Sequence, residues 1–406
     1  MLKVLVGSHA VAPLRYRDFR VLIAVSTLNM VAMMGSQVAI GWFVLELTDS
    51  PFMVAVASAL RMLPNFILGM PAGAIADIVD RRRLIQTANL LVAMPMIAVG
   101  LLVAGNNAEL WMVIAITTLG GIFQVFNMTA RSSLAFDITG SSGALQGLTL
   151  MRLTGGIGGL VGSVVIGFVT ARIGIDAAFF SLGGIYALSA VVSLFIKGRG
   201  QAAPTTRSSP WDSLKGLGTQ MRSNRSLALL TLSTGLAEML GFSHMVLLPS
   251  IARDVLGFDA AGLGLLSGFR NLGGVVGSIF LATVGDRPIK GLLYQASLLV
   301  FGGLMLLLSF SSQFSVVVVL LVSISAMMAV TSILSQSLMQ LVVPNELRGR
   351  AMGVWQLAIG TSPAGSVQIG AMASLAGLTV ALSLNGFGLV LVALSLLLFA
   401  PSMRKL

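Results

Sequence analysis

The chain contains no cysteine, so it can form neither a disulfide bond nor a thiolate metal site. Its two histidines, His9 and His244, lie far apart in the sequence, which argues against a cluster of imidazole ligands. Charged residues make up only 10% of the chain, whereas they make up about a quarter of a typical soluble domain. We therefore expect no metal site and no bound cofactor, and the composition excludes an ordinary soluble enzyme.

Apolar residues take the place of the missing charges. They make up 56% of the 406 residues, and the mean hydropathy is +0.95. A helix needs about 20 largely apolar residues to cross a bilayer. Twelve such windows, separated by short polar breaks, cover residues 21–46, 51–76, 84–104, 110–130, 145–170, 175–196, 226–251, 260–284, 291–310, 314–341, 351–376 and 378–400. The sequence therefore predicts an all-α polytopic membrane protein with twelve transmembrane helices.

One polar stretch is longer than the others and lies between the sixth and seventh windows. It covers residues 197–225 and is rich in serine, glycine, proline and cations. We expect a six-helix bundle over residues 1–196, a linker over 197–225 and a second six-helix bundle over 226–406. The segment before Arg15 has no small-residue cleavage site after a compact apolar run, so we expect no removable signal peptide.

The cations indicate an orientation in the membrane. Most of the 25 lysines and arginines fall before the first window, in the linker, at the C-terminus, or in the breaks after the second, fourth, eighth and tenth windows. Arg131 is counted here as a residue of the break that follows window 110–130. Because basic loops stay on the cytoplasmic side, we expect both termini and the linker to be cytoplasmic, in a cell inner (plasma) membrane protein. The net charge of +11 thus reports orientation, and we expect no nucleic-acid partner.

An internal repeat relates the two halves. The separation between Arg61 and Asp77 recurs between Arg270 and Asp286, and Ser58 and Ser267 stand at the same offset. Arginine inside a membrane helix is rare, so two in register are hard to attribute to chance. The repeat predicts two pseudo-symmetric six-helix bundles.

The segment from Gly73 to Arg82 contains a glycine, an aspartate and a basic pair. It resembles the signature loop between the second and third helices of the major facilitator superfamily, with Ile78 where a cation is usual and Asp80 where glycine is usual. The resemblance implies the major facilitator fold and a cytoplasmic gating motif. The gating candidates, which include the second copy of the motif and a later basic loop, are Gly73, Asp77, Arg81, Arg82, Asp286, Arg287, Lys290, Arg348 and Arg350.

Two further segments resemble branches of this superfamily. In window 145–170, Arg152 is followed by closely spaced glycines, similar to the glycine-rich helix of drug–proton antiporters, with Gly156 in place of the usual proline. Residues 343–352, followed by Ser362-Pro363, closely resemble the enterobactin-exporter-like branch. The resemblances cover nearly the whole chain. They imply an efflux transporter and do not name its cargo.

Polar residues inside the windows are candidates for the substrate path, because each is costly in lipid. Such residues serve as often to hydrogen-bond helices together as to bind a ligand. The small number of charges favours an amphiphilic cargo, such as a drug-like or siderophore-like compound. The candidates for a substrate cavity are Asn29, Gln37, Arg61, Asn65, Gln124, Asn127, Arg152, Asn271, Gln336 and Gln356.

One acid remains inside a window after the loop acids are subtracted. Glu238 lies about a dozen residues into window 226–251, at a depth comparable with that of Arg270. Burial favours a neutral carboxyl group and a nearby arginine favours a charged one, so access from either side could change its protonation. Proton coupling by Glu238 and Arg270 is one hypothesis. A permanent structural pair is the alternative.

These features together favour a secondary transporter over an enzyme. No nucleotide-binding loop of the G-x-x-x-x-G-K-[ST] type is present, so an ion gradient would drive transport. We expect a monomer that interacts with a small-molecule substrate, protons and membrane lipid, and that exports its substrate by alternating access. An uptake symporter of the same fold is one alternative. A membrane enzyme acting on lipids is another, although neither histidine stands beside a plausible nucleophile and acid.

Overall fold

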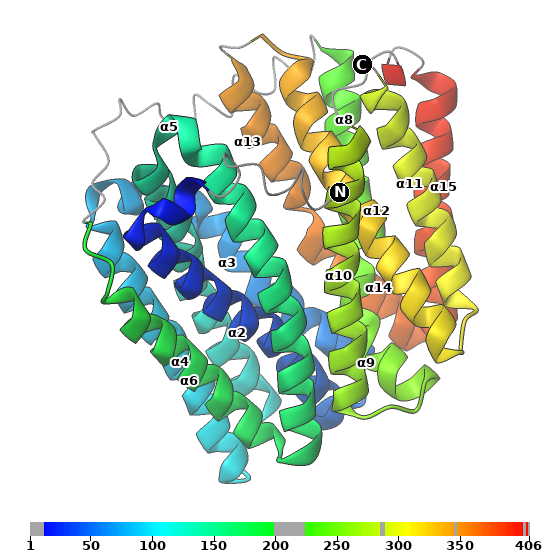
Figure 1. Ribbon diagram of the computed structural model, residues 1–406. Coiled ribbons are helices and arrows are strands. Elements are labelled where there is room, and N and C mark those ends of the chain that lie inside the picture. The colour runs from blue at the N-terminus through cyan, green and yellow to red at the C-terminus, as the bar shows by residue number, and fades with distance from the viewer. Residues whose placement is uncertain (1–11, 199–223, 285–288, 345–346, 401–402, 405–406) are drawn as a thin grey trace. The chain divides into compact units, whose positions relative to one another are not determined.

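The computed structural model describes residues 12–198, 224–284, 289–344, 347–400 and 403–404, and the elements defined within these ranges are helices (Figure 1). The N-terminal segment and most of the predicted linker lie outside the described residues. The elements are η1 (Ala12–Arg15), α2 (Arg17–Thr48), α3 (Pro51–Ile78), α4 (Arg81–Ala104), α5 (Leu110–Arg172), α6 (Ile175–Ser193), α8 (Arg225–Leu236), η2 (Ala237–Gly241), η3 (Phe242–Leu247), α9 (Leu248–Ser250), η4 (Ile251–Val255), α10 (Ala260–Val284), α11 (Lys290–Ser309), α12 (Phe314–Leu341), α13 (Arg348–Ile359), α14 (Ser362–Ala376) and α15 (Leu378–Phe399).

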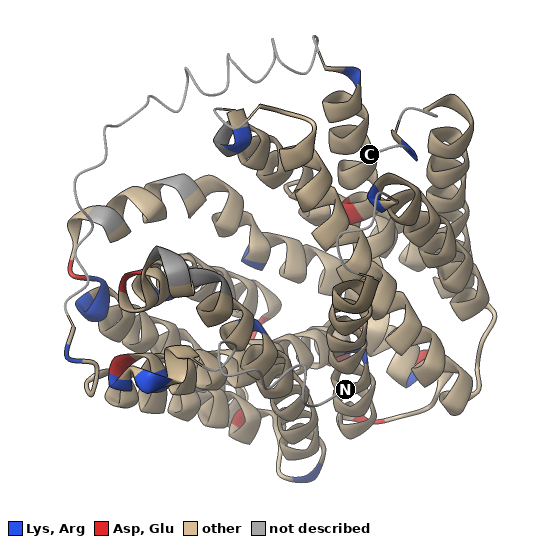
Figure 2. Ribbon diagram, turned by 45° about the horizontal axis from the view of Figure 1, so that its top comes forward, with Lys and Arg blue, Asp and Glu red and all other residues tan. Residues whose placement is uncertain are grey.

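Eleven helical segments among the described residues are long and apolar enough to cross a membrane. Their outer surfaces carry large apolar side chains such as Ile67, Leu101 and Ile157, each more than 60% exposed. Charged positions are sparse along the ribbons (Figure 2). Exposed apolar surface on this scale is stable against lipid rather than water. The prediction of an all-α polytopic membrane protein is confirmed.

Helix α5 contains two of the predicted windows without an intervening loop. The break between them is at Gly140, whose φ of 67° and ψ of 175° suit a residue without a Cβ. The helix before the break therefore continues beyond residue 130, and the prediction that Arg131 lies in a loop is wrong. The helix continues because Ala130 and Leu134 are buried in the interior of the protein, which a hydropathy window does not detect.

The predicted window 226–251 is helical but changes its pitch four times. It begins as α8, passes through the π-helical turn η2 and the 3-10 turn η3, returns to α-helix in α9, and ends in the π-helical turn η4. Single π-turns are rare and occur often at functional sites, because they displace side chains and release backbone carbonyls.

Predicted window 351–376 forms two shorter helices, α13 and α14, separated at Gly360 and Thr361. The Thr361 hydroxyl donates to the carbonyl of Gly235, 2.8 Å away, and so fixes the break against α8. Pro363 follows in the first turn of α14, where a missing N–H costs nothing. Neither helix alone meets the length needed for a span, and together they occupy the remaining predicted window.

The chain divides into two compact units. Unit 1 contains residues 1–48, 60–205 and 258–268, and unit 2 contains residues 49–59, 206–257 and 269–406. Helices α3 and α10 each contribute residues to both units. In unit 1, α2 packs on α5 and α6, and α4 packs on α5 and α6. In unit 2, α11 packs on α12 and α15, and α14 packs on α15 and η3.

One end of unit 1 has a dense apolar core that supports the charged residues described below. Phe19 and Leu22 of α2, Ile85 of α4 and Leu134 of α5 are 0–1% exposed and pack together. Ile196, which follows α6, completes this cluster. The cluster fixes the start of α4 against the middle of α5, where the charged groups of the α3–α4 turn lie.

Candidate functional site

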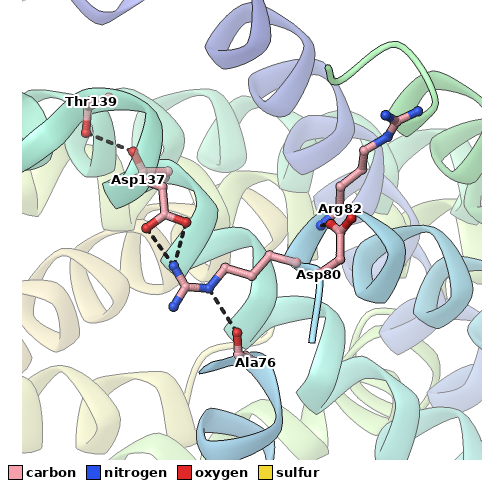
Figure 3. A network of polar contacts seen from close by, with 7 residues as sticks. Ala76, Asp80, Arg82, Asp137 and Thr139 are labelled. Carbon is pink, nitrogen blue, oxygen red and sulfur yellow. Dashed lines mark hydrogen bonds and ion pairs between the residues drawn. The ribbon is translucent and has the colours of Figure 1, made fainter. Parts of the chain in front are cut away.

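The α3–α4 turn is short, and Asp80 ends it by capping α4. Its carboxylate accepts hydrogen bonds from the backbone N–H groups of Arg82 (2.9 Å) and Arg83 (3.4 Å). These N–H groups have no partner inside the helix, so the cap stabilises the first turn. Asp80 stands where the superfamily usually has glycine, and in this chain it serves as a helix cap (Figure 3).

Arg81 forms the central ion pair of this end of unit 1. Its Nη1 atom lies 2.6 Å and 2.5 Å from the two carboxylate oxygens of Asp137 in α5, and its Nε atom donates to the carbonyl of Ala76 in α3, 3.0 Å away (Figure 3). The Arg81 side chain is 6% exposed and that of Asp137 25%. One guanidinium group thereby connects α3, α4 and α5. Sequence reasoning missed Asp137, although it is an acid close behind Arg131 on the predicted cytoplasmic side.

Further polar contacts join the ends of α4 and α2 to the segment after α6. The Arg82 Nη2 atom donates to the carbonyl of Leu194 at 3.0 Å, and Gln86 donates to the carbonyl of Ser193 at 3.3 Å. The Asp18 carboxylate at the start of α2 accepts from the backbone N–H of Gly198 at 2.7 Å. A cavity of about 400 Å³ lies beside these groups and is lined in part by Asp18 and Asp137.

The structure describes only some of the other gating candidates. Gly73 lies on α3, Lys290 is the first residue of α11, and Arg348 is exposed at the start of α13. The side chains of Asp77 and Arg350 lie outside the described residues, as do Asp286 and Arg287. The second copy of the motif therefore lies largely outside the part of the chain that the structure describes.

Glu238 lies on the π-helical turn η2 in the interior of unit 2. It is 7% exposed and is the only fully buried acid among the described residues. Its carboxyl group lies beside the hydroxyl of Ser362, the first residue of α14. Both Glu238 and Arg270 are described, and no ion pair joins them.

Arg270 of α10 lies elsewhere in the interior of unit 2. Its Nη2 atom donates to the side-chain oxygen of Asn271 at 3.1 Å, and its Nε atom has no partner among the described residues. His244 of η3 is fully buried and within electrostatic reach of Arg270. The Nδ1 atom of His244 lies 2.7 Å from the carbonyl of Gly241, and its Nε2 atom has no partner among the described groups.

Two further arginines lie in unit 1: Arg131 is buried and Arg61 is half-buried. The Arg61 Nη2 atom donates to the Ser36 hydroxyl at 2.8 Å, and Arg131 Nη1 lies 3.4 Å from the carbonyl of Ser26. Tyr186 of α6 is 2% exposed and within electrostatic reach of both arginines. Neither Tyr186 nor Arg131 was among the predicted cavity residues, because Tyr186 reads as apolar in a hydropathy window and Arg131 was placed in a loop.

The remaining cavity candidates divide by exposure. Asn29 is buried and donates to Ser189 (2.7 Å), and Asn127 is buried and donates to Asn89 (2.7 Å), so both connect helices of unit 1. Gln124 is half-buried in α5, with its amide nitrogen 3.8 Å from the Met33 sulfur. Those that are half-buried in unit 2 are Asn271 and Gln336, and those that are exposed are Gln37, Asn65, Arg152 and Gln356.

The glycines that follow Arg152 serve helix packing. A Cβ at Gly158 would lie 2.9 Å from the carbonyl oxygen of Thr27 in α2, and one at Gly155 would lie 3.2 Å from Met30. A Cβ at Gly162 would collide with the backbone of Val31. Close approach of helices at small residues is common in membrane bundles.

Comparison with known proteins gives a family. Residues 8–405 match the family described as transmembrane secretion effector, within the major facilitator superfamily. The multidrug efflux pump Tap of Mycolicibacterium fortuitum is 26% identical over 385 residues, which cover 91% of this chain and 92% of the pump. The enterobactin exporter EntS of Salmonella typhimurium is 24% identical over 365 residues, or 88% of this chain and 86% of the exporter.

Solved structures share the fold. The nucleoside transporter NupG matches with a TM-score of 0.80 at 10% identity, covering 96% of this chain and 100% of that one. A POT family transporter matches with a TM-score of 0.79 at 13% identity, covering 96% of this chain and 97% of the other. The predicted major facilitator fold is confirmed over nearly the whole chain.

Proposed function

The chain belongs to the transmembrane secretion effector family of the major facilitator superfamily, and we propose that it exports a small amphiphilic compound across the plasma membrane in exchange for protons. This family consists of transporters, so the alternative of a membrane enzyme acting on lipids is excluded. Two relatives that match most of the chain are named as an efflux pump and an exporter, which supports the outward direction.

The position of Glu238 carries the proposal of proton coupling. A carboxyl group that is 7% exposed and bears no ion pair to Arg270 is free to exist in a neutral form. Ser362 offers a hydroxyl that can donate to the charged form or accept from the neutral one. The π-turn lets this part of the span change its backbone hydrogen bonds without unfolding the helix.

We assign the coupling step to these groups. Glu238 takes up a proton from outside and releases it inside, and its pairing with Arg270 changes as cargo binds. The absence of an ion pair between Glu238 and Arg270 argues against a permanent structural pair.

The first experiment finds a cargo and then measures coupling. The chain is expressed in an efflux-deficient bacterium, and a panel of amphiphilic drugs is screened for raised resistance. The compound with the largest effect is then added to inverted vesicles that hold a pH gradient. Transport of the compound into the vesicle lumen should dissipate the gradient, as reported by a pH-sensitive dye.

Glu238→Gln tests the role of the buried acid. We expect the variant to lose dissipation of the gradient upon addition of the compound while its membrane level stays at that of the wild type. Glu46→Gln, which changes an exposed acid at the end of α2, is the matched control and should transport normally. Proton-driven transport by Glu238→Gln at the wild-type rate would rule out Glu238 as the proton carrier.

The vesicle experiment also separates export from uptake. An exporter moves its substrate into the lumen of inverted vesicles, whereas an uptake symporter would move it out. Loss of preloaded compound from the lumen, driven by the gradient, would favour the symporter.

The α3–α4 turn is proposed as the gating latch. The Arg81–Asp137 ion pair and the Asp80 cap hold this end of unit 1 in one arrangement. Asp77→Asn should slow turnover while the protein stays inserted and folded. Wild-type transport by that variant would reduce the motif to an orientation signal.

The absence of cysteine gives a direct test of the proposed orientation. A single cysteine introduced at an exposed position in the α3–α4 turn should be labelled by an impermeant maleimide in inverted vesicles and protected in intact cells. The opposite pattern would place both termini and the linker outside the cytoplasm.

A further inference from the structure

Arg131 is buried and Arg61 half-buried in unit 1, and no acid among the described residues forms an ion pair with either of them. Arg131 is 7% exposed, and its Nε atom has no hydrogen-bond partner among the described residues. Arg61 has the neutral hydroxyl of Ser36 as its partner. The one ion pair among the described residues of this unit joins Arg81 to Asp137. A buried charge without a counter-charge is expensive, so these two groups call for an explanation.

Both guanidinium groups lie along one face of α2. Ser26, Asn29, Met33 and Ser36 follow one another at three- and four-residue spacing, which places them on the same side of the helix. Arg131 reaches the carbonyl of Ser26 and Arg61 reaches the hydroxyl of Ser36. Ten residues of helix correspond to ~15 Å between the two Cα atoms. The carbonyl of Ser26 points toward the C-terminal end of α2 and the side chain of Ser36 tilts toward its N-terminal end, so the two contacted atoms lie closer together than that.

Helix α6 completes the face from another side. Tyr186 is within electrostatic reach of both arginines. This part of α6 lies against the turn of α2 that Arg131 contacts, because the Ser189 hydroxyl donates to the carbonyl of Val25, 3.4 Å away. Ser189, one turn further along α6, accepts from Asn29. Residues of α2, α3, α5 and α6 therefore surround one polar region inside unit 1.

Several polar atoms in this region are buried without a partner among the described residues. The possible donors are Arg131 Nε and the Ser26 hydroxyl, and the acceptors are Asn29 Oδ1 and Gln124 Oε1. Buried polar atoms normally find a partner, so this set fits a ligand that brings both an anionic oxygen and hydrogen-bond donors.

We propose that Arg61, Arg131 and Tyr186 form a subsite that binds an anionic group of the cargo, a carboxylate or a comparable planar oxyanion. The inference rests on the proposed export function and specifies its substrate class. Arginine stays charged even when buried, and its planar donors match the two oxygens of a carboxylate. The anion supplies a counter-charge that no described residue gives to Arg61 or Arg131, and the partnerless Asn29 and Gln124 oxygens accept from hydroxyl or N–H groups beside it.

The test compares two probes that differ in charge alone. Naphthoate carries a carboxylate, and naphthamide carries a neutral amide on the same ring. Binding of each to the full chain in phosphatidylcholine nanodiscs is measured by equilibrium dialysis, with empty nanodiscs subtracted. We expect naphthoate to bind roughly ten-fold more tightly than naphthamide, as a charge-assisted hydrogen bond allows.

Variants then locate the binding. Arg131→Gln and Arg61→Gln should each weaken naphthoate binding by roughly ten-fold and leave naphthamide binding unchanged. Arg131→Lys, which keeps the charge but loses the planar fork, should fall between the wild type and Arg131→Gln. Arg172→Gln, at the exposed end of α5, is the matched control and should bind both probes as the wild type does.

Other outcomes would overturn the subsite. Equal binding of the two probes, or unchanged naphthoate binding in both arginine variants, would leave the arginines without a role in anion binding. Nanodiscs that contain phosphatidylglycerol distinguish a lipid headgroup from cargo. Retention of phosphatidylglycerol by the wild type but not by Arg131→Gln, together with no naphthoate binding in its absence, would assign the site to lipid. Because dialysis needs no proton gradient, a lack of naphthoate binding can be distinguished from a lack of proton coupling.

Discussion

The interiors of the two units differ in charge and in backbone. Among the described residues, unit 1 buries Arg81 and Arg131 and no acid, on helices that are regular apart from the break at Gly140. Unit 2 buries Glu238 and His244 on a span whose pitch changes repeatedly, and it buries Arg270 on the regular helix α10. The repeat preserves one feature, since Arg61 and Arg270 stand at equivalent positions. Their partners are a serine of another helix in the first case and the neighbouring Asn271 in the second.

The two proposals above assign different tasks to the two units. A positively charged interior on a rigid frame suits recognition of an anion, because fixed donors lose little freedom on binding. An acid on an irregular span suits a change of protonation, because the neighbouring hydrogen bonds can rearrange. The following predictions either introduce into unit 1 a buried acid like that of unit 2, or measure the stability of the helix packing in each unit.

The largest effect should come from placing an acid in unit 1. The carbonyl of Ser26 lies 3.4 Å from Arg131 Nη1, so we expect the carboxylate of Ser26→Asp to lie close enough to the guanidinium group to offset its charge. The new acid would balance the charge that is proposed to bind cargo. Naphthoate binding should fall by more than roughly ten-fold, as measured by equilibrium dialysis. Thr87→Asp, on an exposed position of α4, is the control and should bind normally. Unchanged binding by Ser26→Asp would show that the two interiors do not differ in this way.

The next effect concerns the rigid frame of unit 1. Gly162→Ala would place a methyl group against the backbone of Val31 in α2, which no side-chain rotation can relieve. Helices α2 and α5 must then separate, and we expect the free energy of unfolding to fall by about 3 kcal/mol. The thermal midpoint in detergent reports the change. Gly184→Ala has open space around it and should be neutral or stabilising by about 0.5–1 kcal/mol. Equal midpoints for the two variants would mean that α2 and α5 are not held by this contact.

Much of this architecture is readable from the sequence, for a physical reason. Hydropathy reports contact with lipid, so it locates windows such as 84–104 and 314–341 within a few residues of α4 and α12. It cannot report where a helix continues into a protein interior. Window 110–130 ends before the charged residue Arg131, whereas the helix runs on to Gly140.

The candidate site was less predictable, because it depends on contacts between distant segments. Arg81 was identified from its motif, but its partner Asp137 lies 56 residues away on another helix. Glu238 was found by subtraction, since it is the one acid left inside a window. Neither the π-turn that carries it nor its neighbour Ser362 has a sequence signal that hydropathy detects.

A smaller effect is expected in the irregular span of unit 2. A Cβ at Gly241 would lie 2.6 Å and 2.7 Å from two ring atoms of Phe301, a side chain that can shift. Gly241→Ala should therefore lower the free energy of unfolding by about 1–2 kcal/mol, less than Gly162→Ala. Because the carbonyl of Gly241 contacts His244, the variant also disturbs the ring. Gly303→Ala, on the same helix as Phe301 but in open space, should not lower the midpoint. A loss as large as that of Gly162→Ala would contradict the view that this span adapts more readily.

The smallest effect concerns an exposed charge in unit 2. Asp49 lies 2.5 Å from Arg253, but its side chain is 84% exposed, and Arg253 also pairs with Asp254 at 2.7 Å. Exposed pairs contribute little, so Asp49→Asn should change the free energy of unfolding by less than about 0.5 kcal/mol.

The backbone at Asp49 matters more than its charge. Its φ of 49° lies in the left-handed region, which asparagine tolerates and alanine does not. Asp49→Ala should therefore cost about 1 kcal/mol, and Asp49→Gly should recover that loss. The thermal midpoints of the three variants give the order directly. If Asp49→Asn were as destabilised as Asp49→Ala, the charge and not the backbone would hold this turn. An exposed ion pair would then contribute more to the stability of unit 2 than the contacts of the buried arginines suggest for unit 1.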